Sequence, residues 1–175
     1  ELRGDKILIA LGSSPMLPSI EGLEETPYLT SDLLTSQEEM ELKELPSSLI
    51  IVGGGYIALE LGQMFARFGT RVTILERNTR VLRHGYEPEV GITIQRILRN
   101  EGINVQTKAE VVRVSGDERE VSVTARVDGQ EQAFRAARLL IATGREPNTR
   151  NVGLEAAGVE LVDGGAVKVD EHLRT

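Results

Sequence analysis

Three short runs of mostly apolar residues stand out along the chain, and each has the length of a single strand. They cover Lys6 to Leu11, Leu49 to Val52 and Arg138 to Ala142. Each run is closed within two residues by a glycine. Continuous apolar runs bounded by turn residues are typical of strands buried on both faces, as in parallel sheets. We therefore expect a buried strand at each of these positions.

Two other segments carry apolar residues at helical spacing. The first runs from Tyr56 to Phe68 and is followed by Gly69, while the second begins at Pro88 and continues to Asn100. Proline is favoured in the first turn of a helix and glycine just after the last turn. We predict an amphipathic helix in each segment, with a further strand from Arg71 to Glu76 after the first helix.

The second half of the chain has the pattern of short strands and a hairpin. Ile103 to Gln106 and Val111 to Val114 are short strand candidates, and apolar residues alternate from Val121 to Val127. Asp128 and Gly129 follow directly and form a dipeptide typical of tight hairpins. The strand–helix–strand order predicts an α/β fold with a parallel sheet, accompanied by an antiparallel β-ribbon.

Proline content divides the chain into parts. Four prolines lie between residues 15 and 46, with an acidic stretch around Gln37 to Glu44. Such a segment is typical of a connection with at most one short helix. We predict three parts: residues 1–45 as a domain edge with a connecting segment, 46–148 as the main domain, and 149–175 as a return segment.

Charge and composition exclude several classes of function. The 175 residues include 20 Lys and Arg against 27 Asp and Glu, which leaves a net charge of -7. This balance provides no basic field for nucleic acid or anionic lipid, and no apolar run approaches the ~20 residues that span a bilayer. The sequence shows no leader, and we expect an excised piece of a cytoplasmic protein.

The chain contains no cysteine, so it offers neither a disulfide nor a thiolate nucleophile. Its two histidines, His84 and His172, have no second ligand at metal spacing, and we expect no metal site. Any redox chemistry would therefore depend on a bound cofactor.

A glycine motif between the second apolar run and the first helix carries the most information. Gly53-x-Gly55-x-x-Ala58 follows a strand and opens a helix, and Glu76 ends the next strand 23 residues after Gly53. In a dinucleotide site the first glycine permits a tight turn, the second admits the pyrophosphate, and a carboxylate accepts hydrogen bonds from the ribose. The alternative is an ordinary strand-to-helix corner with a solvated Glu76.

Two residues near the glycines have open roles. The ring of Tyr56 either covers whatever lies beyond the pyrophosphate or packs as a partly buried tyrosine. Glu60 is an isolated charge among apolar residues. It either touches the cofactor or pairs with a base such as Arg67 or Arg71.

Residues after the second strand give conflicting indications about cofactor choice. Glu76 suits the ribose diol of NAD, whereas Arg77 and Arg83 suit the 2'-phosphate of NADP if they reach it. Both arginines could instead point to solvent. We expect the carboxylate to dominate and NAD to be favoured.

These motifs resemble the pyridine-nucleotide site of the flavoprotein disulfide reductases. The resemblance is carried by Gly53 to Glu60 followed by Arg71 to Glu76. Ala10 to Pro15 and Ala142 to Asn148 resemble two further segments of that family, the end of its FAD domain and the end of its nucleotide domain. The resemblance implies a Rossmann-like parallel sheet of the FAD/NAD(P)-binding type, with residues 1–45 and 149–175 belonging to the edge of the FAD domain.

Within that family the mercuric reductases are the most similar group, and the dihydrolipoamide dehydrogenases and glutathione-reductase-like enzymes are the alternatives. The similarity lies in Leu59 to Gly69, Tyr86 to Gly91 and Gly144 to Thr149. It implies hydride transfer from NAD(P)H to FAD, then to a cysteine pair and to Hg(II). Tyr56 would gate the nicotinamide pocket and Glu60 would contact the nicotinamide end. The residues expected to hold the cofactor are Gly53, Gly55, Tyr56, Ile57, Ala58, Glu60, Glu76, Arg77, Arg83, Val111 and Gly144.

The resemblance also implies what this chain lacks. The FAD glycine motif and redox cysteines would precede Glu1, and a dimerisation domain would follow Thr175, in a parent that is a homodimer. We expect the chain to bind NAD(P)H without turnover. A free-standing NAD redox sensor and an S-adenosylmethionine methyltransferase remain as alternatives, the latter disfavoured by the hairpin at Asp128.

Overall fold

The structure is a computed structural model that describes residues 4–32, 42 and 44–175. The chain divides into two compact units, one formed by residues 15–144 and the other by residues 1–14 together with 145–175. Most of the acidic stretch from Gln37 to Glu44 lies outside the described residues. The assignment of segments 1–45 and 149–175 to a flavin domain stays a prediction.

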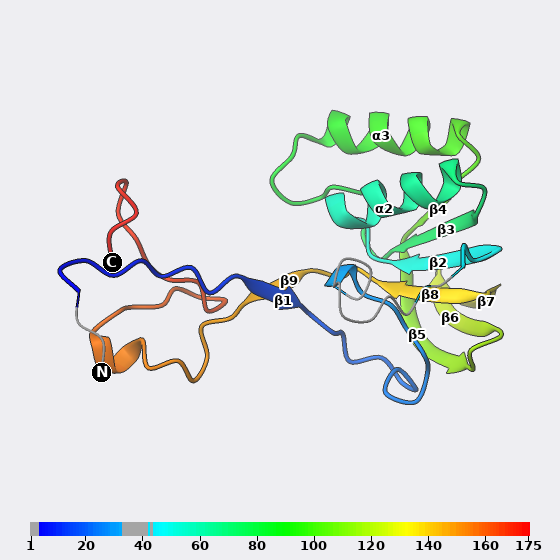
Figure 1. The fold of residues 1–175 in the computed structure, drawn as a ribbon. Helices are drawn as coiled ribbons and strands as arrows, with labels where there is room; N and C mark the ends of the chain where they lie inside the picture. The colour runs from blue at the N-terminus through cyan, green and yellow to red at the C-terminus, as the bar shows by residue number, and fades with distance from the viewer. Residues whose placement is uncertain (1–3, 33–41, 43) are drawn as a thin grey trace. The chain divides into compact units, whose positions relative to one another are not determined.

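The centre of the larger unit is a four-stranded parallel sheet in the order β4-β3-β2-β8 (Figure 1). Its strands are β2 (Ser48–Val52), β3 (Arg71–Glu76), β4 (Asn104–Thr107) and β8 (Arg138–Ile141). All three pairings are parallel. The strands predicted around these positions are therefore confirmed, with β4 shifted by one residue along the chain.

Helices cover one face of this sheet and a second sheet covers the other (Figure 1). The helices are α2 (Tyr56–Arg67) and α3 (Pro88–Asn100), as predicted. The second sheet is antiparallel and consists of β5 (Ala109–Gly116), β6 (Val121–Val127) and β7 (Gln130–Ala136). It is the predicted β-ribbon with one more strand, and the fold is α/β as expected.

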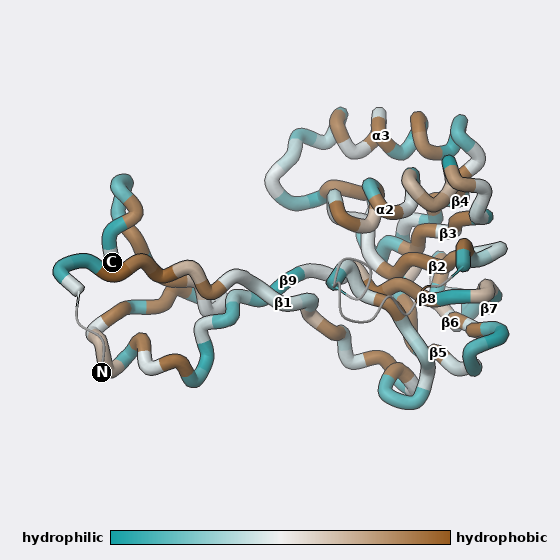
Figure 2. The backbone as a smooth tube through the Cα atoms, viewed as in Figure 1, coloured by the Kyte–Doolittle hydropathy of each residue, from teal (hydrophilic) through white to brown (hydrophobic). Residues whose placement is uncertain are grey.

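The apolar runs form strands because both faces of the parallel sheet are buried. In β2, Leu49 and Ile51 pack on the helix side, while Ile50 and Val52 pack on the side of the antiparallel sheet. All four side chains are at most 6% exposed. Figure 2 shows the hydrophobic colouring that continues along the central strands. Successive side chains of β2 point to opposite faces of the sheet and enter two separate cores. This explains why no position within the run is polar.

The predicted hairpin is also confirmed. Asp128 and Gly129 join β6 to β7, and both have positive φ, 47° and 85°. Two left-handed residues in succession match the right-handed twist of the flanking strands.

The smaller unit contains a two-stranded sheet of β1 (Ser13–Pro15) and β9 (Arg145–Pro147), followed by the short helix η1 (Glu155–Ala157). Polar side chains hold this pairing, since Ser14 Oγ donates to Asn148 Oδ1 at 2.8 Å and Arg145 Nε donates to Ser13 Oγ at 2.9 Å.

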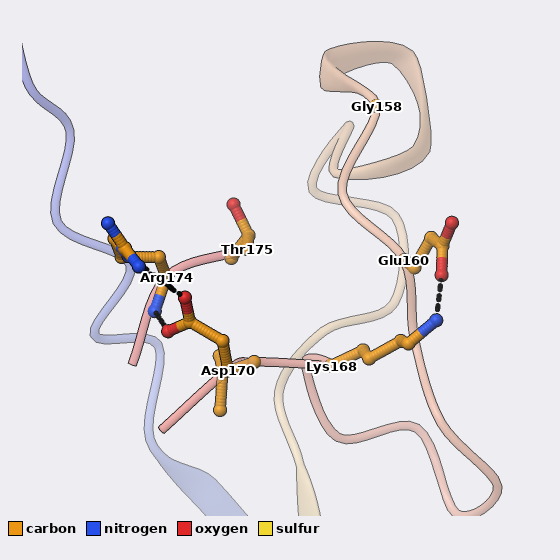
Figure 3. A pocket seen from close by; sticks show the side chains of 7 residues that line it. Gly158, Glu160, Lys168, Asp170, Arg174 and Thr175 are labelled. Carbon is orange, nitrogen blue, oxygen red and sulfur yellow. Dashed lines mark hydrogen bonds and ion pairs between the residues drawn. The ribbon is translucent and has the colours of Figure 1, made fainter. Parts of the chain in front are cut away.

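A cleft of about 630 Å³ near the end of the smaller unit is lined mainly by charged residues (Figure 3). Lys168 pairs with Glu160 at 2.5 Å and Arg174 pairs with Asp170 at 2.9 Å. Lys168 lowers the pKa of Glu160, chiefly through this hydrogen bond. The charged side chains that line the cleft therefore form two ion pairs, Lys168 with Glu160 and Arg174 with Asp170, in which the charges cancel.

The first apolar run does not form the buried strand that its pattern predicts. Residues 6–11 have no regular secondary structure, and Ile7 and Leu8 are 86% and 89% exposed. A strand is stable only when its backbone groups find a ladder partner. The described part of the chain offers none to residues 6–11, so hydrophobic pattern alone gave the wrong expectation. Within that same part, no helix has the length and apolar character needed to cross a membrane.

Candidate functional site

Gly53 follows the last residue of β2, where the chain turns towards α2, and it lies next to the ends of β3 and β8. Gly53 has a φ of 121°, and a Cβ on it would lie 2.3 Å from the carbonyl oxygen of Ala142. Its N–H donates to the carbonyl of Leu75 at 2.9 Å. Both the backbone conformation and the neighbouring chain require glycine here. This agrees with the predicted tight turn.

Gly54 is required for a different reason, which sequence reasoning missed. A Cβ on Gly54 would lie 2.5 Å from Oε2 of Glu76. The carbonyl of Gly54 also accepts a hydrogen bond from Leu82 N at 2.9 Å. The glycine thus lets the carboxylate at the end of β3 approach the glycine loop. The available signal was the run of three consecutive glycines, of which Gly54 is the middle one.

Gly55 has neither constraint. Its φ of −79° is open to every residue type, and no atom of the described residues lies within 4 Å of the position that its Cβ would take. The protein itself therefore gives no reason for glycine at this position. The space in front of Gly55 is free, and a residue without a side chain keeps it free.

The N-terminus of α2 faces the same loop. The first turn contains Tyr56, Ile57 and Ala58, holds no acidic residue, and has no side-chain cap at Gly55. N–H groups in a first helical turn have no intrahelical partner and carry the positive end of the helix dipole, which favours a bound anion. Ala58 is fully buried and lets the helix pack closely on the sheet.

Tyr56 is 56% exposed. More than half of the residue is therefore free of packing contacts, and its role stays a prediction. An exposed ring at the first position of the helix can move over whatever binds at the loop.

Glu76 is the buried carboxylate of the site, with only 7% of the residue exposed. Its Oε1 accepts hydrogen bonds from both the backbone N–H and the side-chain Nδ2 of Asn78, each at 2.6 Å. Among the described residues no donor reaches Oε2. Since every fully enclosed side-chain oxygen of the described residues has a hydrogen-bond partner, Oε2 keeps some exposure. The alternative of a fully solvated Glu76 is thus not what the structure shows.

The arginines of the following loop behave differently from each other. Arg83 donates a short hydrogen bond through Nη1 to Oδ1 of Asn78, whereas Arg77 is exposed and contacts no described polar group. Arg80 donates to the carbonyl of Leu82 at 2.7 Å and thereby holds the loop. Both arginines are exposed, as the solvent alternative expected, and Arg83 in addition hydrogen-bonds Asn78. Asn78, which sequence reasoning missed, hydrogen-bonds both the carboxylate of Glu76 and the guanidinium of Arg83.

Glu60 is exposed on α2, and it does not pair with Arg67 or Arg71. Instead, Arg67 pairs with Glu101 at the C-cap of α3 at 2.9 Å. The proposed ion pair of Glu60 with Arg67 was wrong because seven residues separate the two along one helix, about two turns. Glu60 remains available to a ligand.

The other two predicted residues, Gly144 and Val111, lie after β8 and within β5. Gly144 follows β8, has a φ of 141°, and accepts a hydrogen bond from Met16 N at 3.0 Å. Val111 is half-buried in β5, where the pairing with β6 shifts register between Val111 and Arg113. Ala142 lies two residues before Gly144, and its carbonyl oxygen lies against Gly53. The segment after β8 therefore contacts the loop that begins at Gly53. For Val111 no contact with the glycines is established.

Comparison with known proteins agrees with this geometry. The family model for pyridine nucleotide-disulphide oxidoreductases matches residues 1–175. Mercuric reductases of Staphylococcus aureus and Streptomyces lividans are 42% and 45% identical, each over 96% of this chain. A dihydrolipoyl dehydrogenase of Geobacillus stearothermophilus is 36% identical over the same share.

Among solved structures, the HOCl-induced flavoprotein disulfide reductase RclA of Escherichia coli is similar with a TM-score of 0.82 and 38% identity, over 99% of this chain and 38% of that one. The chain spans only 30% and 34% of the two mercuric reductases and 34% of the dihydrolipoyl dehydrogenase. By these matches along its whole length, the chain belongs to the pyridine nucleotide-disulphide oxidoreductase family.

Proposed function

We propose that this chain is the NAD(P)H-binding domain of a FAD-dependent disulfide oxidoreductase. The observation that carries the proposal is the free space at Gly55, directly before the N-terminus of α2. Gly53 and Gly54 are explained by contacts within the protein, and Gly55 is explained only by something that binds there. A pyrophosphate meets this requirement, because it needs close backbone approach and favours a helix N-terminus.

Each residue of the site would contact a different part of the cofactor. The first-turn N–H groups of α2 would bind the phosphates, and Oε2 of Glu76 would accept a hydrogen bond from the adenosine ribose. The exposed ring of Tyr56 would cover the nicotinamide end, close to the carboxylate of Glu60. Gly144 and Val111 would line the cofactor through their backbone. When bound, NADH supplies a hydride.

NADH is the favoured cofactor in this proposal. Glu76 is buried and keeps one oxygen accessible, and a phosphate on the ribose would bring like charges together. Arg83 is engaged by Asn78, which leaves Arg77 as the free cation of the described loop. Membership of an oxidoreductase family leaves the methyltransferase alternative without support.

For the longer reductase we propose that electrons pass from NADH to FAD, then to a cysteine pair and to Hg(II), in a cytoplasmic homodimer. The similarity to several mercuric reductases supports this acceptor over lipoamide. The chain itself contains no cysteine and cannot perform the thiol step. It would therefore bind NADH without turning it over.

Calorimetric titration of this chain with NADH tests the binding function, with S-adenosylmethionine as the comparison ligand. We expect saturable binding of NADH alone, and no oxidation of NADH when Hg(II) is added. Binding of S-adenosylmethionine in place of NADH would overturn the proposal. Reduction of lipoamide but not of Hg(II) by the longer reductase would overturn the proposed acceptor.

A further inference from the structure

Asn78 is held at the centre of the loop after β3 by four hydrogen bonds. Its backbone and side-chain nitrogens both donate to Oε1 of Glu76 at 2.6 Å, and its side-chain oxygen accepts from Nη1 of Arg83. Its carbonyl accepts from Lys108 N at 2.8 Å, at the connection between β4 and β5. The amide therefore stands between a buried carboxylate and an arginine, bonded to both.

We propose that Asn78 is a positioning residue that sets the preference for NADH over NADPH. The inference rests on the proposed function, because it concerns how the same site discriminates its two possible cofactors. It assigns two separate effects to one side chain, one on Glu76 and one on Arg83.

The first effect is to fix which carboxylate oxygen remains for the ligand. Oε1 already accepts two hydrogen bonds from Asn78, whereas Oε2 accepts none from the described residues. A buried carboxylate loses much of its hydration and is stabilised when its oxygens are hydrogen-bonded. Asn78 satisfies one oxygen and leaves the other to accept a ribose hydroxyl. The side chain next to Gly54 is thus oriented by the amide, and no basic residue of the described chain contacts it directly.

The second effect is to give the guanidinium of Arg83 a hydrogen-bond partner other than the ligand. A guanidinium next to the ribose would attract a 2'-phosphate, or would pair with Glu76 and compete with the hydroxyls. Here the guanidinium of Arg83 is bonded instead to a neutral amide. A released Arg83 that attracts the 2'-phosphate would strengthen NADPH binding. A released Arg83 that pairs with Glu76 would weaken NADH binding. Both consequences shift the preference towards NADPH.

An asparagine suits this position because its side chain offers a donor and an acceptor at the same time. Aspartate would accept from Arg83 but could not donate to Glu76, and it would add a like charge. Alanine would keep the backbone N–H bond to Oε1 and remove both side-chain bonds. Asn78→Ala therefore separates the role of the amide from that of the loop backbone.

The test is calorimetric binding of NADH and NADPH to this chain and to Asn78→Ala, with Asn104→Ala, an exposed asparagine on β4, as the matched control. We expect the ratio of the NADPH Kd to the NADH Kd to fall about tenfold in Asn78→Ala, the scale of a lost hydrogen bond to a charged group. The control should keep the wild-type ratio. A general loss of structure would weaken both cofactors alike and would leave the ratio unchanged.

The double variant Asn78→Ala/Arg83→Gln separates the two effects. We expect its NADPH affinity to return to that of the wild type, while its NADH affinity stays below it, because the carboxylate still lacks the amide. An unchanged ratio in an Asn78→Ala protein whose thermal unfolding matches that of the wild type, with normal NADH binding by the wild type, would overturn this inference alone. Failure of the wild type to bind either cofactor would overturn the proposed function and this inference with it.

Discussion

The carbonyl oxygen of Ala142 occupies the place where a side chain on Gly53 would begin. A Cβ on Gly53 would lie 2.3 Å from that oxygen, closer than two non-bonded atoms can approach. The contact joins the end of β2 to the end of β8, whose last residues pair in parallel register. The loop of Gly53, Gly54 and Gly55 is therefore packed against the sheet at Gly53, its back, and is open at Gly55, its front.

The first prediction concerns the back of the loop. Gly53→Ala should destabilise the fold by about 3 kcal/mol, from strain at a φ of 121° and from the clash with Ala142. Gly69→Ala is the control, because the φ of Gly69 is 104° but no atom of the described chain lies within 4 Å of its Cβ position. It should cost about 1 kcal/mol. Urea unfolding measures both, and equal losses would show that the clash is relieved.

The second prediction concerns the front of the loop. Gly55→Ala should change stability by only a few tenths of a kcal/mol up to about 1, since its conformation and its surroundings accept a methyl group. The same change should weaken NADH binding at least about tenfold, because the methyl group enters the space of the pyrophosphate. Thermal unfolding and calorimetry check the two halves. Wild-type affinity in this variant would show that the free space is not the cofactor site.

The sequence was sufficient to predict the parts of the fold whose causes are local or periodic. The β2 run, the two amphipathic helices and the hairpin at Asp128 follow from spacing and turn chemistry, and the structure has them within a residue or two. Gly53 and Glu76 were placed at neighbouring strand ends because parallel strands bring their carboxyl ends to one edge.

What the sequence could not show depends on partners distant along the chain. Residues 6–11 have the composition of a strand but no ladder partner among the described residues. Arg67 pairs with Glu101, 34 residues away, rather than with a residue of its own helix. Asn78 is an ordinary loop residue by pattern, and only its contacts with Glu76 and Arg83 distinguish it.

The third prediction concerns the link between the helices. Arg67 holds the pKa of Glu101 below its usual value, mainly through a hydrogen bond, with a further contribution from Gln63. Arg67→Ala should raise that pKa towards the ordinary glutamate value. Because the folded-state pKa is lowered, the stabilisation from this pair is present above the unfolded pKa and is lost as the pH falls through the folded one. An NMR titration of Glu101 checks the shift, and an unchanged pKa in the variant would contradict the role of Arg67.

The last prediction concerns the choice of cofactor at Glu76. A 2'-phosphate within about 4 Å of this carboxylate would cost on the order of 4 kcal/mol before screening, at an effective dielectric constant of ~20. Glu76→Ala removes that repulsion and leaves Arg77 and Arg83 in place, and it also frees Arg83 further by removing the partner of Asn78. We expect the wild type to prefer NADH modestly and the variant to prefer NADPH. Glu118→Ala, a change in the connection between β5 and β6 away from the loop, should keep the wild-type preference. Dissociation constants for both cofactors on the three proteins decide the question, and tighter NADPH binding by the wild type would mean that the arginines outweigh the carboxylate.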